Sequence, residues 1–421
     1  MFVVIPLALS MLLAPAQEQI EGQPAPAQEQ TEAVVLSQSY ALNEWLESRL
    51  GDRQSNVGSK QSAKFGLQAN MFLAITEKAD AFEQFNRLRM RSLVFNAQQG
   101  LDFGVLFGTF AIGDYDDFDE VIMAQLGIML NDIGLGLPGT TDLQIGRYFA
   151  DVGAFNSYLP ADFAAPHLDG VRRSFFGGNL SLLGLELQNN TFLDNGHFHV
   201  SVGVASDRQS FDFDNFSPTS VTGSNANQRF SAENWLATSR ASMQFDFNDS
   251  HSMRIGATAI LSPAEIVFND TGLPKLEREE IEHNNFGGEL GFIFNTGIDR
   301  SHEIAFEVWA DDSQYLDESS GAYPYSLSRG EWGMYQFNYD ATWSLGALAS
   351  RYDALGLSEL DDDDAHHHSA WLSYSPNLGG DVSLFGTHTN PGQGQEKYFT
   401  VGMAFSLDFG RSQTRGYSRW Y

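Results

Sequence analysis

Three arginines at alternate positions are the most distinctive charged group in the sequence. Arg87, Arg89 and Arg91 interleave with Leu88 and Met90, so in a β-strand, whose side chains alternate between two faces, they share one face. A guanidinium facing lipid near the bilayer midplane costs about 2–4 kcal/mol in a barrel strand. If this strand crosses a membrane, we expect the arginines to line the lumen as a basic ladder that attracts anions. A ladder neutralised by carboxylates across the lumen is an equally good interpretation.

A second charged group lies in the long polar segment 150–177. We expect this segment to fold into the lumen of a barrel and narrow it, and an ordinary external loop is the alternative. The side chains that could line such a constriction are His167, Asp169, Arg172 and Arg173.

Acidic side chains and histidines gather in two further polar segments. The first holds Asp114, Asp116, Asp117, Asp119 and Glu120. The second holds Glu359, Asp361, Asp362, Asp363 and Asp364, followed by His366, His367 and His368. Carboxylates suit hard cations and imidazoles suit Zn²⁺ or Ni²⁺, but no EF-hand spacing occurs, and neighbouring histidines in a strand point to opposite faces. We therefore favour solvated loops that bind divalent cations loosely and bridge to lipopolysaccharide over a defined metal site, and we expect no cofactor.

Sixteen stretches of alternating side chains are the elements that would position these groups. In 398–409 every odd position is apolar and every even position is small or polar, which predicts a strand with one greasy face. The predicted strands are 65–76, 85–97, 101–113, 120–133, 141–149, 178–190, 197–206, 232–248, 251–262, 283–295, 302–312, 330–340, 342–353, 366–375, 381–390 and 396–409.

The connections between these stretches sort by length. Short turns rich in Asn, Asp and Gly, which favour hairpins, are expected at 98–100, 194–196, 248–250, near 340 and at 376–380. Long polar loops are expected at 150–177, 207–231, 263–282 and 313–329. The sequence therefore predicts an all-β fold: a transmembrane, antiparallel, up-and-down β-barrel of about 16 strands, with short periplasmic turns and long extracellular loops.

Composition agrees with a barrel and excludes other classes. The 421 residues are 42% hydrophobic with a mean hydropathy of −0.25, and they lack the apolar runs of roughly 20 residues that membrane helices need. A net charge of −30 argues against a nucleic-acid partner. The absence of cysteine means that the fold needs no disulfide. No Gly-x-Ser-x-Gly or His-Glu-x-x-His pattern occurs, so we expect no enzyme.

The expected organisation has four parts. Residues 1–16, an apolar run ending in Ala-Pro-Ala, read as a signal peptide. Residues 17–63 read as a periplasmic linker rich in Gln, Glu, Pro and Ala, with a short amphipathic helix over 34–50. The barrel follows over 64–409, and 410–421 form a C-terminal tail.

Aromatic side chains near the predicted strand ends are expected in the girdles at the membrane interfaces. They are Tyr115, Trp235, Trp309, Trp332, Tyr335, Trp343 and Trp371. Packing in the core of a soluble β protein is the alternative.

Several motifs are shared with a known family. They are LQIGRYFADVGAFN at 143–156, RSFFGG at 173–178, GLEL at 184–187, LGALASRYD at 345–353, WLSYSP at 371–376 and Asn390-Pro391. The chain thereby resembles a largely uncharacterised family of bacterial outer-membrane porin-like proteins, sometimes labelled zinc-regulated outer-membrane receptors. In the closing strands of outer-membrane proteins, assembly machinery reads a polar–x–Gly–x–x–apolar–x–apolar signal, and the residues that fit it here are Thr400, Gly402, Phe405 and Leu407.

The function expected from these features is that of an outer-membrane porin, a passive channel for small hydrophilic solutes or ions. Sixteen strands leave an aqueous lumen. The expected partners are outer-membrane lipid, lipopolysaccharide, the barrel-assembly machinery and two further copies in a homotrimer. A receptor that takes up a metal or small ligand and a non-conducting surface adhesin are the alternatives. Uptake receptors usually have about 22 strands and a plug domain. The roughly 50 residues before the predicted barrel are too few to form such a plug.

Overall fold

The computed structural model describes the strand-forming part of the chain. The described residues are 63–76, 88–101, 103–113, 120–154, 156, 179–211, 235–248, 250–269, 277–297, 300–314, 325–340, 342–354, 364–375, 380–390 and 397–409. All of them belong to one compact unit, Asn43–Tyr421. No helix among them is long and apolar enough to cross a membrane. The expected signal peptide, the helix over 34–50 and the C-terminal tail lie outside the described residues.

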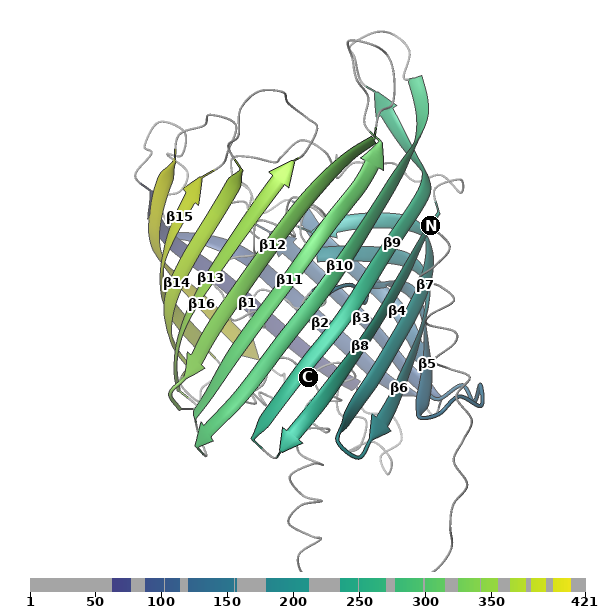
Figure 1. Cartoon of the computed structure of the whole chain (residues 1–421), viewed down its shortest axis with the longest axis horizontal. Coiled ribbons are helices and arrows are strands. Elements are labelled where there is room, and N and C mark those ends of the chain that lie inside the picture. The colour runs from purple at the N-terminus through teal and green to yellow at the C-terminus, as the bar shows by residue number, and fades with distance from the viewer. Residues whose placement is uncertain are drawn as a thin grey trace, which may run out of the picture. The chain divides into compact units, whose positions relative to one another are not determined.

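Sixteen strands form one antiparallel sheet that closes on itself (Figure 1). They are β1 (Ala63–Thr76), β2 (Leu88–Leu101), β3 (Gly104–Gly113), β4 (Glu120–Leu130), β5 (Thr140–Phe149), β6 (Asn179–Leu193), β7 (Gly196–Phe211), β8 (Leu236–Asn248), β9 (His251–Asn269), β10 (Glu277–Gly297), β11 (Arg300–Gln314), β12 (Tyr325–Asn338), β13 (Trp343–Ala354), β14 (Ala365–Tyr374), β15 (Gly380–Asn390) and β16 (Tyr398–Phe409). Each strand pairs with its neighbours in the chain, and β1 pairs with β16. Closure leaves no unpaired edge, as a structure surrounded by lipid requires. The predicted fold and strand number are confirmed.

Connection length differs between the two ends of the barrel. Residues 194–195 and 298–299 suffice at one end, whereas 150–178 and 212–235 connect strands at the other. The expected sorting of short turns and long loops is therefore confirmed. Two connections were misplaced. β2 does not turn at 98–100 but continues to Leu101, which pairs with Gly104. Most of the long loop expected at 263–282 is strand, because β9 continues to Asn269 and β10 begins at Glu277.

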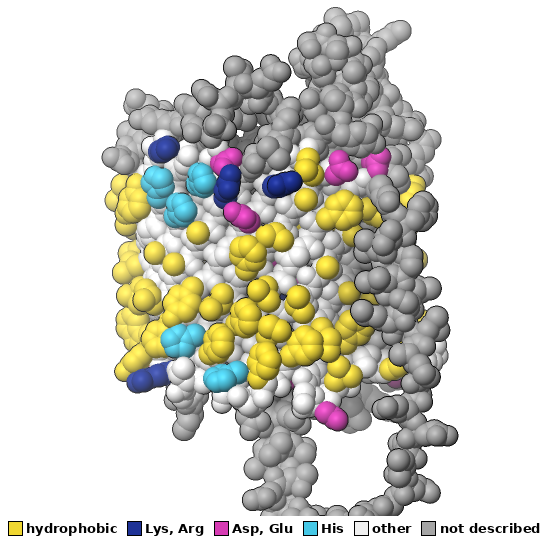
Figure 2. Space-filling model, viewed as in Figure 1, with side chains coloured by type: hydrophobic (Ala, Val, Ile, Leu, Met, Phe, Trp, Pro, Cys, Tyr) yellow, Lys and Arg dark blue, Asp and Glu magenta, His cyan; other side chains and the backbone are white. Residues whose placement is uncertain are grey.

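Large apolar side chains cover the outer face of the barrel. In β16, Phe399, Val401 and Leu407 are 43%, 52% and 39% exposed, whereas Tyr398 and Thr400 are buried. Figure 2 shows hydrophobic side chains in a band across one face. Other exposed members are Leu126, Leu185, Val202, Val204, Ile255, Leu345, Leu372 and Leu384. Because an apolar surface of this extent is rarely left in water, this band marks the part of the wall that faces the bilayer.

The aromatic girdle is only partly as expected. Trp235, Tyr335 and Trp343 are exposed on the outer face. Trp309, Trp332 and Trp371 are only 4%, 1% and 2% exposed, so the interface position expected for these three is wrong. Tyr115 lies outside the described residues.

The inward tryptophans pack over small residues on neighbouring strands. Trp371 pairs with Gly346 of β13, and its indole occupies the space where a Cβ at Gly346 would lie. Trp309 covers Gly287 of β10 in the same way. An aromatic ring that covers a glycine on the adjacent strand shields exposed backbone and fixes the strand register.

Candidate functional site: an inner segment held by an ion-pair network

The chain that follows β5 turns into the barrel. These residues, called the inner segment here, are all buried: Ala150, Asp151, Val152, Gly153, Ala154 and Asn156. Asn156 fastens the segment, because its Nδ2 donates to the carbonyl oxygens of Ala150 and Leu180, both at 2.8 Å, and its Oδ1 accepts from the Leu180 N–H at 2.6 Å. The start of the expected constriction loop therefore folds inward. Residues 157–178 lie outside the described residues.

Backbone N–H groups of the inner segment donate to side chains of the barrel wall. The Asp151 N–H donates to Glu186 Oε2 of β6 at 3.0 Å, and the Gly153 N–H to Thr258 Oγ1 of β9 at 3.1 Å. The Ala154 N–H donates to Glu307 Oε1 of β11 at 2.5 Å. A buried N–H group without an acceptor is costly, so the wall side chains take the place of a strand partner. The segment thereby contacts the wall from β6 to β11.

Gly153 is required where the inner segment approaches β11 most closely. Its φ is +60°, a conformation that side chains other than glycine rarely adopt. A Cβ there would also lie 2.9 Å from Glu307 Oε1 and from Trp309 Cζ2. Any larger residue would therefore push the segment off the wall.

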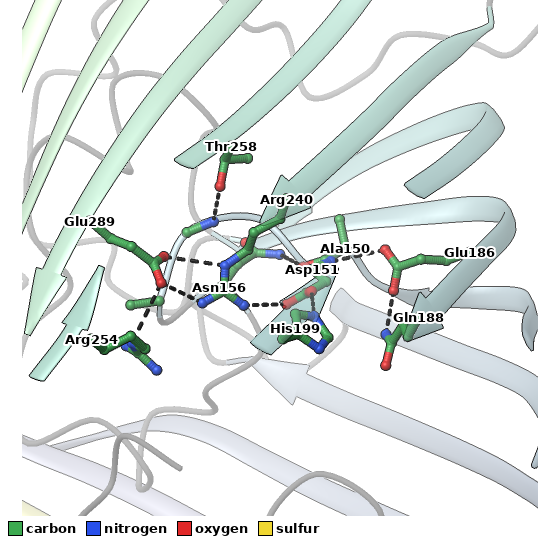
Figure 3. Close-up of polar contacts among 12 residues, drawn as sticks. Ala150, Asp151, Asn156, Glu186, Gln188, His199, Arg240, Arg254, Thr258 and Glu289 are labelled. Atoms are coloured by element: carbon green, nitrogen blue, oxygen red, sulfur yellow. Dashed lines mark hydrogen bonds and ion pairs between the residues drawn. The ribbon is translucent and has the colours of Figure 1, made fainter. Parts of the chain in front are cut away.

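Asp151 is the charged centre of the site (Figure 3). Its Oδ2 lies 2.5 Å from His199 Nε2 of β7, and its Oδ1 accepts from Arg240 Nη1 of β8 at 2.7 Å. The other ring nitrogen of His199 lies 2.7 Å from Asn190 Oδ1 of β6. The Asp151 and Arg240 side chains are each 2% exposed. Charges this deeply buried persist only when they are paired and hydrogen-bonded.

Arg240 joins Asp151 to a second carboxylate on the wall. Its Nη2 donates to Glu289 Oε1 of β10 at 2.6 Å, and its Nε to Glu289 Oε2 at 3.2 Å. This two-pronged contact uses the planar fork of the guanidinium. Arg254 of β9 adds a longer ion pair, 3.4 Å from its Nε to Glu289 Oε1. The network therefore runs from the inner segment through β8 to β9 and β10.

Glu307 forms the far anchor of the inner segment. Besides the Ala154 N–H, it accepts the indole N–H groups of Trp309 at 3.1 Å and Trp332 at 2.9 Å, both on Oε2. Trp309 and Trp332 thus have a polar role, since a buried indole N–H needs an acceptor. They hold the carboxylate in place to receive the segment.

The rest of the lumen wall has a different character. Between their ends, the inner faces of β13–β16 carry small or neutral side chains: Gly346, Ser350, Ser369, Trp371, Ser373, Phe385, Thr387, Thr400 and Gly402. The charged side chains that hold the inner segment therefore belong to the β6–β11 half.

The expected basic ladder meets an irregularity in β2. Arg87 lies outside the described residues. The register of β1 with β2 passes from Met90 to Ser92 and skips Arg91. A β-bulge of this kind interrupts the alternation from which Arg89 and Arg91 were placed on one face. The ladder stays a prediction.

The other predicted residues are only partly described. His167, Asp169, Arg172 and Arg173 lie outside the described residues, as do Asp361, Asp362 and Asp363. Asp364 pairs with Arg351, with its Oδ2 2.5 Å from Nη2. His366 and His368 stack with ring centroids 6.2 Å apart, while His367 contacts Thr389. Among the described residues, no group of three or more His, Cys, Asp or Glu side chains could hold a metal ion. Loose cation binding at the acidic loops stays a prediction.

The expected assembly signal lies in the strand that closes the barrel. Thr400 and Gly402 are buried on the inner face, and Leu407 is exposed on the outer face. Phe405 pairs with Met71 of β1. Recognition of these residues by assembly machinery stays a prediction.

The central residues of the site were missed from the sequence. Asp151, Arg240, Glu289 and Glu307 are each a single polar residue on the polar face of a strand, or just after one. Any lumen-facing residue has that pattern. A charged residue in the middle of a predicted strand could have indicated them. Arg240 and Glu289 lie well inside predicted strands, and a charge at that depth of the membrane finds a polar environment only in the lumen.

Comparison with known proteins bears on the fold. No family model matches the sequence, and no curated protein matches it. Among solved structures, OprB of Pseudomonas putida is similar with a TM-score of 0.53 and 12% identity, over 85% of this chain and 96% of that one. The outer-membrane protein OmpT of Vibrio cholerae, with loop L8 deleted, has a TM-score of 0.51 and 12% identity over 83% and 100%. The trimer form of OmpT has a TM-score of 0.50 and 11% identity over 83% and 100%. The resemblance to outer-membrane porin-like barrels is thus confirmed for the fold, and the chain has the architecture of these bacterial outer-membrane proteins.

Proposed function

We propose that this protein is a porin of the bacterial outer membrane, a passive aqueous channel for small hydrophilic solutes or ions. The observation that carries the proposal is a closed barrel of sixteen strands with the inner segment folded against one side of its lumen. Barrels of eight strands are filled by side chains, whereas those of sixteen leave an aqueous channel. The segment narrows such a lumen by occupying part of it.

The two halves of the wall suggest where a solute passes. The inner segment lies on β6–β11, where its charges are already paired. A solute would pass between the segment and the neutral side chains of β13–β16. Because the charges of Asp151, Arg240 and Glu289 are used to hold the segment, we expect them to set the width of the channel more than its charge preference.

Single-channel recording in a planar bilayer tests the proposal. A porin gives steady, ohmic current steps from the purified protein. A receptor whose lumen is plugged, or a non-conducting adhesin, gives little current, and that result would overturn the proposal.

The reversal potential in a salt gradient then tests the basic ladder. Replacing Arg87, Arg89 and Arg91 together with Gln should shift the preference toward cations, because three positive charges leave the lumen. An unchanged reversal potential would contradict the basic ladder but not the proposal that the protein is a channel.

We further propose that the barrel assembles as a homotrimer. The support is the trimer form described for Vibrio cholerae OmpT, to which this fold is similar. Chemical cross-linking of the protein in mild detergent should yield a ladder ending at three copies. A species that stays at one copy would contradict the trimer but not the channel.

A further inference from the structure

A groove on the outer wall breaks the apolar surface of the barrel. It has a volume of about 520 Å³ and crosses β10 to β13. Its apolar side is formed by Phe286, Gly288, Val308 and Ala310, and its charged side by Arg329, Glu331 and Arg351. Phe286 and Val308 are exposed members of the outer face. The groove therefore opens outward and not into the lumen.

The strand register explains the hollow. Phe286, Ala310 and Arg329 are register partners across β10, β11 and β12, and Gly288, Val308 and Glu331 form the next row. Gly288 and Ala310 have the smallest side chains and occupy diagonal positions in the two rows. A larger residue at Gly288 would crowd Val308, whose Cγ2 lies 3.3 Å from the position of a Cβ. The depression is thus set by the backbone and by two small side chains.

The charged side of the groove presents two guanidinium groups. Arg329 is exposed on β12 and lies in register with Asp353 of β13. Arg351, 50% exposed, is oriented by its ion pair with Asp364. Arginine matches the geometry of a phosphate group better than lysine does.

The groove lies on the loop side of the apolar band. Arg351 is near the end of β13 that leads into the connection 355–364, whereas Trp343 begins β13 at the turn side. Figure 2 shows basic, acidic and histidine side chains gathered on this face above the hydrophobic band. A guanidinium is costly near the bilayer midplane and nearly free of cost at the interface. The position therefore corresponds to the headgroup level of the outer leaflet.

Three histidines, His366, His368 and His388, lie next to the charged side of the groove on β14 and β15. His366 is the register partner of Arg351, and His368 is the partner of both Ala349 and His388. The rings of His368 and His388 stack with centroids 6.3 Å apart. Their N–H groups add hydrogen-bond donors suited to phosphate and sugar hydroxyl groups.

We propose that this groove binds a phosphorylated glycolipid of the outer leaflet, of the lipid A class. A phosphate group sits between Arg329 and Arg351, and an acyl chain lies over Gly288 and Ala310 beside Phe286 and Val308. The pairing of cations with an adjoining apolar hollow fits an amphiphile with a phosphate head, whereas a soluble anion would leave the hollow unused. The inference rests on the proposed outer-membrane location but not on conduction. The current recordings can therefore contradict the channel without contradicting the lipid site, and the lipid measurement can contradict the site without contradicting the channel.

Native mass spectrometry of the detergent-solubilised full-length protein with diphosphoryl lipid A tests the proposal. The unmodified protein should retain one lipid A at low micromolar concentration. The double variant Arg329→Gln, Arg351→Gln should bind it about tenfold more weakly or worse, because charge-assisted hydrogen bonds to phosphate are lost. Glu331→Gln should bind more tightly, because it removes a carboxylate that repels the phosphate. Folding of each variant is checked by its heat-dependent shift in gel mobility.

Arg300→Gln is the matched control. Arg300 is also exposed on the outer wall, but it lies at the turn end of β11, over the ring of Tyr339 at 4.7 Å. Equal binding by the double variant and the unmodified protein would overturn the proposal, as would an equal loss in Arg300→Gln. Competition by millimolar inorganic phosphate as effective as that by lipid A would overturn the lipid assignment. Loss of oligomers in the double variant with lipid binding intact would instead assign the groove to a second copy of the chain.

Discussion

The two halves of the lumen wall differ in how their inner faces are built. From β6 to β11 the wall carries Arg240, which pairs with Asp151 of the inner segment and with Glu289. It also carries the carboxylates of Glu186 and Glu307, which accept backbone N–H groups of that segment. From β13 to β16 the middle of the wall carries neutral side chains: serine, threonine and glycine together with Leu348, Trp371 and Phe385. The β6–β11 part holds the inner segment through these contacts. Charge on β6–β11 therefore serves to position a segment of chain, whereas the middle of β13–β16 is neutral.

That division has an energetic reason. A buried ion pair contributes little net stability, because desolvation offsets the Coulomb attraction, but the loss of one partner is severe. The Asp151–Arg240–Glu289 network therefore fixes one geometry for the inner segment rather than adding much stability. The neutral half makes no such geometric demand, so it should tolerate substitution.

Loss of Arg240 should have the largest effect. In Arg240→Met, the buried carboxylates of Asp151 and Glu289 lose the guanidinium that they share, and breaking a buried ion pair in this way costs about 3–5 kcal/mol. We expect the inner segment to detach, the single-channel conductance to rise and fluctuate, and the urea midpoint of unfolding in detergent to fall. Arg254→Met is the matched control, since the ion pair of Arg254 with Glu289 is longer, at 3.4 Å, than the 2.6 Å contact of Arg240 with the same carboxylate. Equal effects of the two substitutions would contradict the central role of Arg240.

Removal of the charge at Glu307 should have the next largest effect. Glu307→Gln keeps the shape but replaces one acceptor oxygen by an NH₂ group, which must then face a donor. Leaving a buried donor unsatisfied costs about 1–3 kcal/mol. We expect noisier current steps with a small increase in conductance. Glu303→Gln removes the same charge from the same face of β11, where Asn338 Nδ2 donates to Glu303 Oε1 at 2.7 Å, and it should leave the current noise unchanged.

A methyl group at Gly346 should disturb the neutral half only locally. In Gly346→Ala the new Cβ overlaps the indole of Trp371, and overpacking of this kind costs about 1–3 kcal/mol. The urea midpoint should fall while the conductance stays near that of the unmodified protein. Adding Trp371→Leu should restore part of the lost stability by making room. A large conductance change in Gly346→Ala alone would show that the neutral half also positions the inner segment.

The barrel itself could be predicted because lipid constrains every second residue. In 398–409 all odd positions are apolar, and the structure places Phe399, Val401 and Leu407 on the outer face. The lumen imposes no equally strict rule. In 302–312 the odd positions include Glu303, Glu307 and Asp311, so the alternation itself puts Trp309 on the polar face. Its position was predicted wrongly because an aromatic side chain near a strand end was assigned to the membrane interface.

The inner network could not be predicted because its contacts join distant parts of the chain. The Ala154 N–H and the Glu307 carboxylate are 153 residues apart in sequence. The inward fold of 150–156 was expected from the length and polarity of the loop, but its anchors depend on which wall residues the closed barrel places beside it. Local patterns carry the period of the strands, whereas these contacts depend on barrel closure and register.

The smallest structural effect, with a clear functional readout, is expected from a charge added to the neutral half. Thr389 is half-buried at the loop end of β15, where its hydroxyl lies 3.4 Å from His367 Nδ1. Thr389→Lys and Thr389→Glu should each change the free energy of unfolding by less than about 1 kcal/mol, because no paired charge is disrupted. If solutes pass along the neutral half, the two substitutions should move the reversal potential in a salt gradient in opposite directions, Lys toward anions and Glu toward cations. Identical reversal potentials for the two variants would mean that ions do not pass near β15, and the passage would then lie on the side of the inner segment, contrary to the division between the two halves.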